Sequence, residues 1–204
     1  MAEEFINFVN ETPTQFHSVN FWRHRLLSKG FIELLESEAW DNLKFSGKYF
    51  MTKNESAIVA FTVGPTVDCI KIMGTHTDSP VLKLAPRTHT TGAGIEQLNV
   101  MTYGGGLWHT WFDRDLKVAG RIIVNNEGKL ESKLVHLNEP LVRIPNLAIH
   151  LTDERGKFEF NKERHLKPIF GLDKETIGYH SADLLKMAAA DAGVQVEQIV
   201  ELEL

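Results

Sequence analysis

The strongest constraint on the fold is a nearly continuous apolar run, residues 69–73, which stops at the sequence GTHTDSP of residues 74–80. A run interrupted only by Lys71 is typical of a strand buried inside a sheet. In extended backbone the side chains of His76 and Asp78, two residues apart, point to one face. Asp78 can then accept a hydrogen bond from the ring nitrogen of His76 that is not on a metal. The pattern predicts half of a metal site at the carboxyl end of a strand, where open α/β sheets place their ligands.

The composition excludes several classes of protein. The 204 residues are 43% hydrophobic and 24% charged, with a formal net charge of −5, which is ordinary for a globular protein. Lys and Arg form no cluster longer than a pair, so no nucleic-acid partner is expected. No apolar run approaches the roughly 20 residues of a membrane-spanning helix, and the acidic amino terminus lacks the pattern of a secretory signal. With the single cysteine, Cys69, these features predict a cytoplasmic protein without a membrane partner.

The first part of the chain combines helical and strand patterns. Apolar spacing and capping residues predict helices at residues 3–9 and 18–29. Residues 48–53 and 57–63 predict a β-hairpin, and residues 69–75 a strand that delivers His76 at its end.

The composition changes after residues 87–97, which are rich in Thr and Gly and predict a loop with a domain boundary. Most of the segments that follow are strand-like. The strands expected there are residues 99–103, 118–124, 130–136 and 199–204. The Asn-Asn-Glu-Gly-Lys sequence at 125–129 indicates a hairpin turn. Ser181 is expected to cap a helix at residues 182–192.

The other candidate residues have ordinary interpretations. With nine histidines in the chain, an isolated His-x-Asp is more often structural than metal-binding. Asp113 and Asp115 flank Arg114, and an ion-pair network between strands explains them better than a second carboxylate cluster. Four histidines lack paired-ligand spacing and are expected at the surface or in packing unless something else singles one out. They are His136, His150, His165 and His180.

Five separated stretches together resemble a known family. They are GTHTDSP at 74–80, TYGGGLW at 102–108, WFDRDL at 111–116, AGR at 119–121 and RIPNLAIHL at 143–151. In this order they resemble the aspartyl aminopeptidases, which are dinuclear zinc exopeptidases of the M18 peptidase class. The similarity runs from near the amino terminus to Leu204.

The resemblance implies an α/β fold class, a zinc-exopeptidase-like α/β sandwich with an inserted, mainly β dimerisation domain. By that pattern residues 1–88 are the amino-terminal segment of the catalytic domain, and residues 89–204 are the dimerisation domain, here incomplete. Members of the family are cytoplasmic or vacuolar and assemble as tetrahedral dodecamers, so a homo-oligomer is expected.

The resemblance also implies roles for three residues. His76 matches a zinc ligand, and Asp78 matches the catalytic-site carboxylate that orients it. His150 matches a histidine that reaches into a neighbouring subunit's active site and contacts substrate, whereas Asp113 and Asp115 match no ligand. The family removes amino-terminal Asp or Glu from peptides with two zinc ions per complete site, for which this chain supplies one matched ligand.

The remaining metal ligands and the general base of the family are expected beyond the point that matches Leu204. A two-metal hydrolysis requires both ions and a base that deprotonates the attacking water. We therefore expect a truncated zinc metalloaminopeptidase that is inactive alone. The alternative is a non-catalytic interaction or regulatory module that co-assembles with full-length aminopeptidase subunits.

Overall fold

The chain divides into two units between Ser79 and Pro80 in the computed structural model, which describes residues 1–41, 43–66, 68–153 and 155–204. The boundary expected between residues 88 and 89 falls inside strand β4, Val81–Gly92. The assignment of residues 1–88 and 89–204 to catalytic and dimerisation domains stays a prediction. None of the described helices combines the length and apolar character needed to cross a bilayer.

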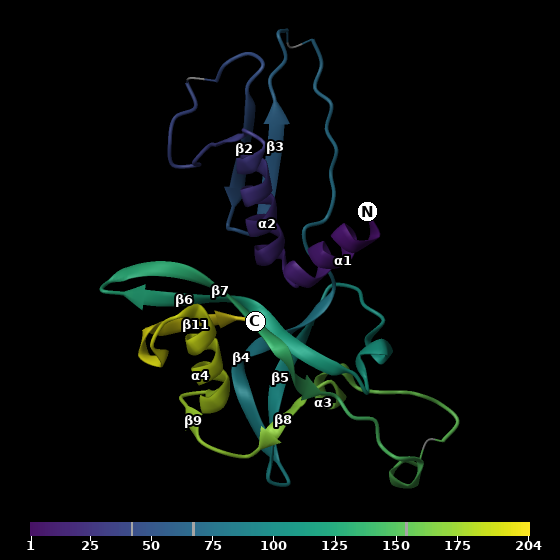
Figure 1. Ribbon diagram of the computed structural model, residues 1–204. Coiled ribbons are helices and arrows are strands. Elements are labelled where there is room, and N and C mark those ends of the chain that lie inside the picture. The colour runs from purple at the N-terminus through teal and green to yellow at the C-terminus, as the bar shows by residue number, and fades with distance from the viewer. Residues whose placement is uncertain (42, 67, 154) are drawn as a thin grey trace. The chain divides into compact units, whose positions relative to one another are not determined.

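The first unit contains two helices and a small sheet (Figure 1). Its elements are α1 (Ala2–Glu11), α2 (Gln15–Ser28), β1 (Ile32–Glu33), β2 (Lys48–Lys53) and β3 (Ala57–Thr62). In the sheet, β2 lies between β1, which is parallel to it, and β3, which is antiparallel. Both helices and the hairpin predicted from the sequence are confirmed.

Few side chains of this unit are fully buried. Phe16 and Val19 of α2 and Tyr49 and Phe50 of β2 form its core. The helix α1 has no buried residue. Helix α1 is therefore held mainly at its surface, where the Phe8 ring packs edge-on to an aromatic ring of α2 at a centroid distance of 5.1 Å.

The predicted strand at residues 69–75 is wrong. None of these residues lies in a strand, and the side chains of Ile70, Ile72 and Met73 are 79%, 86% and 97% exposed. A strand requires a neighbour that pairs with its backbone N–H and C=O groups. The three-stranded sheet of this unit consists of β1, β2 and β3, so the apolar run is not hydrogen-bonded to it as a fourth strand. The pattern identified an apolar segment correctly, but apolar character alone does not supply a partner.

The second unit is built mainly of strands. In the part of the chain that the structure describes, its large sheet has the order β11-β6-β7-β8-β5-β4, with antiparallel pairings throughout. The strands besides β4 are β5 (Ile95–Tyr103), β6 (Asp115–Asn126), β7 (Lys129–Arg143), β8 (Ile169–Leu172) and β11 (Ile199–Glu203). The shorter elements are η1 (Trp108–Trp111), η2 (Ile149–Leu151), α3 (Lys162–His165), β9 (Thr176–Ile177), β10 (His180–Ser181) and η3 (Val196–Gln198).

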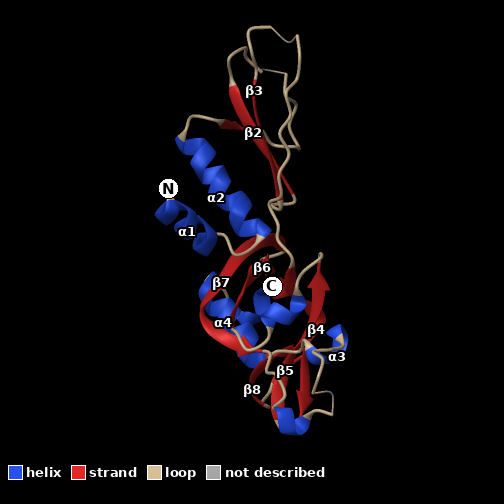
Figure 2. Ribbon diagram, turned by 90° about the vertical axis from the view of Figure 1, so that its right-hand side faces the viewer, coloured by secondary structure: helices blue, strands red, loops and turns tan. Residues whose placement is uncertain are grey.

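The large sheet is curled (Figure 2), and its two edge strands, β4 and β11, are in contact. The backbone N–H of Leu84 in β4 donates to the carbonyl oxygen of Leu204 at 2.8 Å, and Lys83 Nζ lies 3.2 Å from Glu203 Oε1. On the other side of β11, a Cβ atom at Gly120 of β6 would lie 2.0 Å from the carbonyl oxygen of Glu203. Gly120 therefore permits the close approach of β6 and β11.

The core of the second unit lies between this sheet and α4, Ala182–Ala192 (Figure 1). Ile122, Val135 and Leu184 have no exposed surface. The Ser181 hydroxyl accepts from the Leu184 N–H at 3.3 Å, and Gly193, with φ of 68°, ends the helix. The helix predicted at residues 182–192 is confirmed with both of its terminal signals.

The predicted loop at residues 87–97 is also wrong. These residues form the second half of β4, a short turn at Ala93 and Gly94, and the start of β5. Threonine is β-branched and fits a half-buried strand as well as a loop. Thr88 is fully buried, which shows that this part of the Thr-rich stretch faces a core.

Candidate functional site

His76 and Asp78 meet as the sequence predicted. His76 Nδ1 lies 2.8 Å from Asp78 Oδ1. Between them, the Thr77 hydroxyl donates to the carbonyl oxygen of Ser56 at 2.8 Å, which ties the segment to the turn between β2 and β3. The tie fixes the residue between the pair while the two functional side chains contact each other.

The geometry leaves the second ring nitrogen of His76 for a ligand. A carboxylate on Nδ1 favours the tautomer with a proton on Nδ1 and a lone pair on Nε2. The His76 side chain is 90% exposed, whereas that of Asp78 is 28% exposed. An exposed imidazole oriented by a less exposed carboxylate is an arrangement that zinc ligands use, and one such ligand is what this segment offers.

No further ligand joins His76 within the described part of the chain. There, no group of three or more His, Cys, Asp or Glu side chains is placed to hold a metal ion. The chemistry of the pair fits one ligand of a zinc site, and three protein ligands are usual in a catalytic zinc site.

His150 lies in the second unit, in η2. It is exposed, as are the flanking apolar side chains of Ile149 and Leu151, which are 58% and 71% exposed. His76 and His150 belong to different units.

Asp113 and Asp115 form an ion-pair network between strands, as predicted, but the cation is Arg143 of β7. Arg143 Nη1 lies 3.0 Å from Asp115 Oδ1, and its Nη2 lies 4.0 Å from Asp113 Oδ1. Arg114 instead donates through Nε to the carbonyl oxygen of Thr110 at 2.7 Å. The sequence indicated the network and missed its cation, because Arg143 is 28 residues from Asp115 and adjacent to it only through β6–β7 pairing.

Two of the other histidines, His165 and His180, make hydrogen bonds within the second unit. His165 Nδ1 accepts from the backbone N–H of Asn161 at 3.0 Å. His180 Nδ1 lies 3.1 Å from the Thr88 hydroxyl, and burial lowers the pKa of the imidazole from 6.5. These contacts agree with the packing and surface roles expected from the sequence.

One cluster of titratable side chains was missed by sequence reasoning. His89 Nε2 lies 3.3 Å from Asp173 Oδ1 and 3.8 Å from Oε1 of Glu96, whose residue is 2% exposed. The only signal in the sequence is the alternation of side chains along a strand, which places Glu96 on the same face of β5 as the buried Leu98. Asp173 follows β8 and is brought close by the β5–β8 pairing.

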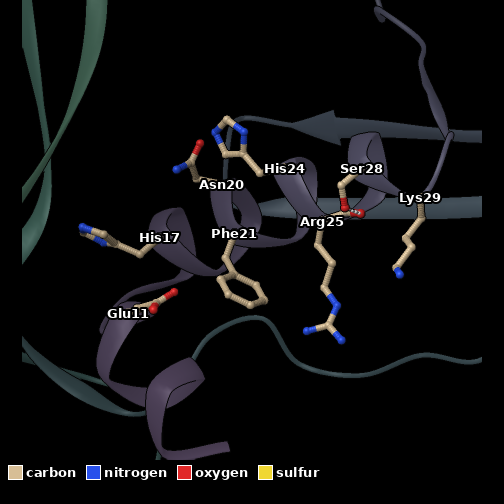
Figure 3. A pocket seen from close by; sticks show the side chains of 8 residues that line it. All are labelled: Glu11, His17, Asn20, Phe21, His24, Arg25, Ser28 and Lys29. Atoms are coloured by element: carbon tan, nitrogen blue, oxygen red, sulfur yellow. Dashed lines mark hydrogen bonds between the residues drawn. The ribbon is translucent and has the colours of Figure 1, made fainter. Parts of the chain in front are cut away.

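A pocket of about 630 Å³ lies along α2 in the first unit (Figure 3). Most of the residues that line it have polar or charged side chains; the lining residues are Glu11, His17, Asn20, Phe21, His24, Arg25, Ser28 and Lys29. Figure 3 shows His24 pointing to one side of the helix and Arg25 and Lys29 to the other. The lining includes no residue of the His76 segment, so this pocket is separate from the candidate metal ligand.

Comparison with known proteins finds one family. The family model described as Aminopeptidase I zinc metalloprotease (M18) matches residues 8–204. An aspartyl aminopeptidase of Caenorhabditis elegans is 43% identical over 225 residues, covering 100% of this chain and 48% of that protein. The chain thus spans about half the length of the curated relatives that it matches.

Solved structures agree with the sequence comparison. A chain of the cryo-EM structure of the Ape4 and Nbr1 complex superposes with a TM-score of 0.90 at 37% identity, covering 99% of this chain and 42% of that one. The mApe1 dodecamer of S. cerevisiae gives a TM-score of 0.78 at 27% identity, covering 99% and 46%. These likenesses confirm the predicted fold class, a mixed α/β fold with a mainly β second part.

Proposed function

Because the chain belongs to the M18 family of aminopeptidase I zinc metalloproteases, we propose that it supplies the amino-terminal half of an enzyme that removes amino-terminal Asp or Glu from peptides. The observation that carries the proposal is the contact of 2.8 Å between His76 Nδ1 and Asp78 Oδ1. The acidic specificity is supported by the name of the C. elegans relative, an aspartyl aminopeptidase.

In this proposal His76 holds zinc through Nε2, and Asp78 keeps the ring in the required tautomer and orientation. The hydrogen bond to a carboxylate also makes the imidazole a stronger ligand. Zinc, when bound, lowers the pKa of bound water and polarises the peptide carbonyl. The described part of the chain contributes one ligand, so the rest of a two-ion site and the general base come from outside it. We therefore propose that the 204-residue chain does not hydrolyse peptides alone.

We assign substrate contact in a neighbouring subunit to His150. The supports are its exposed position, the exposed apolar side chains beside it, and the dodecamer formed by S. cerevisiae mApe1. Peptides and further copies of the chain are accordingly the proposed partners, while the cytoplasmic location stays a prediction.

A second candidate function is a non-catalytic module that joins full-length aminopeptidase subunits. It is favoured by the absence, among the described residues, of any three-ligand group, together with the match of the whole chain to only 48% of a longer relative. Such a module would change the assembly or its activity without hydrolysing peptides.

The metal proposal is tested by isothermal titration of zinc into the chain co-expressed with the remaining half of the C. elegans relative, together with release of Asp from an amino-terminal Asp peptide. We expect chelator-sensitive activity from the pair and none from the 204-residue chain. His76→Ala should abolish activity and remove one zinc-binding event, and Asp78→Asn should weaken zinc affinity by about 10–100-fold.

His24→Ala is the matched control, since His24 is an exposed histidine of the same unit outside the proposed site. It should leave zinc binding and activity unchanged. Activity from the 204-residue chain alone, or full zinc binding by the His76→Ala pair, would contradict the proposal. Co-purification with full-length C. elegans subunits that lowers their activity, with no activity from the two halves, would favour the non-catalytic module instead.

A further inference from the structure

The segment that carries His150 is attached at both ends to two adjacent residues, Phe112 and Asp113. We define the His150 loop as residues 146–158, all of which except residue 154 are described. It leaves the core just after Ile144, which is fully buried, and returns near Leu166, also fully buried. Short loops whose ends lie close together are a common way to hold functional side chains on a rigid scaffold.

The start of the loop is held by the Asp113 side chain. Its Oδ1 accepts from the backbone N–H of Asn146 at 3.1 Å, and its Oδ2 accepts from Asn146 Nδ2 at 2.7 Å. The backbone N–H of Asp113 donates in turn to the carbonyl oxygen of Ile144 at 2.8 Å. Three hydrogen bonds thus connect one residue to the chain just before His150.

The end of the loop is held by the neighbouring aromatic side chain. The Phe112 ring contacts the rings of Phe158 and Phe160 edge-on, each at a centroid distance of 5.1 Å. Edge-to-face aromatic pairs at this separation are favourable beyond their apolar burial. Both ends of the His150 loop therefore converge on Phe112 and Asp113.

The backbone at Asp113 is held in an uncommon conformation. Its φ of 56° lies in the left-handed region, which is unfavourable for most side chains and is tolerated best by Asn, Asp and Gly. An aspartate with this backbone can direct both carboxylate oxygens at Asn146, as the two hydrogen bonds show. Glycine would accept the backbone and provide no such contacts.

We propose that Asp113 is a positioning residue that sets the place of His150 through its hydrogen bonds to Asn146, with Phe112 fixing the other end of the loop. The proposal rests on the proposed role of His150 in substrate contact. In this proposal Asp113 contacts neither the metal nor the peptide. A loop that is held at both ends samples few conformations before a peptide binds. It therefore loses little conformational entropy on binding, which lowers the entropic cost of binding substrate.

The charge state of Asp113 agrees with this role. The backbone and side-chain hydrogen bonds from Asn146 lower the pKa of its carboxyl, and Arg143 adds a smaller effect in the same direction. Arg143 also pairs with Asp115 at 3.0 Å. We call the two hydrogen bonds from Asn146 to the Asp113 carboxylate the latch. Because the pKa of Asp113 is lowered in the folded state, the latch is present at neutral pH and is lost as the pH falls through that lowered pKa.

The latch is tested in the 204-residue chain by amide hydrogen exchange of residues 147–151 at neutral pH. Asp113→Gly keeps the left-handed backbone and removes both side-chain acceptors, so exchange should rise several-fold in the loop with little change elsewhere. Asn146→Ala should give the same rise, and the double variant should add nothing further. Asp113→Asn, which keeps an acceptor for the Asn146 backbone N–H, should fall in between.

Asp115→Asn is the control, because Asp115 shares Arg143 with Asp113 and is not among the residues that hold Asn146. It should leave loop exchange unchanged. When the pH is lowered, the loop amides of the unmodified chain should lose their protection from exchange. In Asp113→Gly the protection of these amides should not change over the same pH range. Unchanged exchange in Asp113→Gly, or equal effects of Asp113→Gly and Asp115→Asn, would overturn the latch.

The substrate role is tested in the co-expressed pair described above. Asp113→Gly should raise KM for an amino-terminal Asp peptide several-fold with a smaller change in kcat. A loosened loop with an unchanged KM would overturn the positioning of His150 toward substrate. Absence of activity from the unmodified pair would count against the proposed function instead, and the exchange measurements would still decide the latch.

Discussion

The two units differ in how they complete their apolar cores. In the second unit a curled sheet brings β4 and β11 together, and Ile122 and Leu184 have no exposed surface. In the first unit α1 has no buried residue, and Ile72 and Met73 are 86% and 97% exposed. A sheet that closes on itself supplies its own covering, whereas a short open sheet leaves apolar side chains at the surface. The candidate zinc ligand follows directly after that uncovered segment.

Gly120→Val should have the largest effect, because it converts the closed sheet into an open one. The new side chain would collide with the backbone of Glu203 and Leu204, whose nearest atoms lie 2.0 and 2.7 Å from a Cβ at this position. We expect a loss of about 4 kcal/mol or more in the free energy of unfolding, above the usual overpacking cost of about 1–3 kcal/mol. Urea denaturation followed by far-ultraviolet circular dichroism measures it.

Gly171→Ala provides the control, since a Cβ there meets no atom within 4 Å. Hydrogen exchange should show the loss of protection in Gly120→Val confined to the second unit. Equal stability of the two variants would mean that β11 is not needed to close the sheet.

Leu184→Ala and Val9→Ala compare a buried side chain of the second unit with an exposed apolar side chain of the first. Leu184 is fully buried in α4, and Val9 in α1 is 51% exposed. Leu184→Ala should cost about 3 kcal/mol through lost burial and a cavity, and Val9→Ala should stay within about 0.5 kcal/mol. Thermal and urea denaturation of both variants measure the loss of stability. A larger loss for Val9→Ala than for Leu184→Ala would contradict the comparison.

The helix caps should show the same contrast on a smaller scale. Ser181 accepts from the Leu184 N–H, whereas Thr14, at the start of α2, makes no side-chain hydrogen bond to the helix backbone and contacts the His17 ring instead. Ser181→Ala should cost about 1 kcal/mol, and Thr14→Ala should cost less. Denaturant midpoints of the two variants measure the difference, and a larger shift for Thr14→Ala would contradict it.

The smallest expected effect is a pH dependence specific to the second unit. Burial lowers the pKa of His180 in the folded state below 6.5, so the unfolded chain binds a proton there first as the pH falls. The contribution of this group to stability is complete above the unfolded pKa and is lost as the pH falls below it. His180→Asn should flatten the stability profile near pH 6.5, as measured by urea denaturation between neutral and mildly acidic pH. An unchanged slope would show that His180 does not contribute.

Capping and turn residues in the sequence predicted the helices and hairpins, whose residues lie close together along the chain. The α4 helix has a serine cap and a terminal glycine, and the β6–β7 hairpin has an Asn-Asn-Glu-Gly turn signal with Glu127 and Gly128 at positive φ. Pairing between distant segments could not be read this way. The run at residues 69–73 has strand composition but lacks a paired neighbour, and the Thr-rich residues near 88 form a strand because β5 lies beside them.

The candidate site divides along the same line. The His76–Asp78 contact spans two residues, so the sequence predicted it from short spacing even though the segment is not a strand and bends at Thr77. The contact between Asp113 and Asn146 spans 33 residues and exists because β6 and β7 are paired. Chemistry within a few residues is therefore visible in the sequence, while chemistry that depends on topology becomes visible only in the structure.

The exposure of Met73 also makes it a chemical reporter. A thioether at 97% exposure is readily oxidised to the sulfoxide by peroxide, and oxidation slows when the sulfur is shielded. Each molecule treated with a brief pulse of peroxide would record, as one added oxygen at Met73, whether the apolar stretch before His76 was covered at that moment. Mass spectrometry of that single peptide could thus follow the covering of the segment in real time.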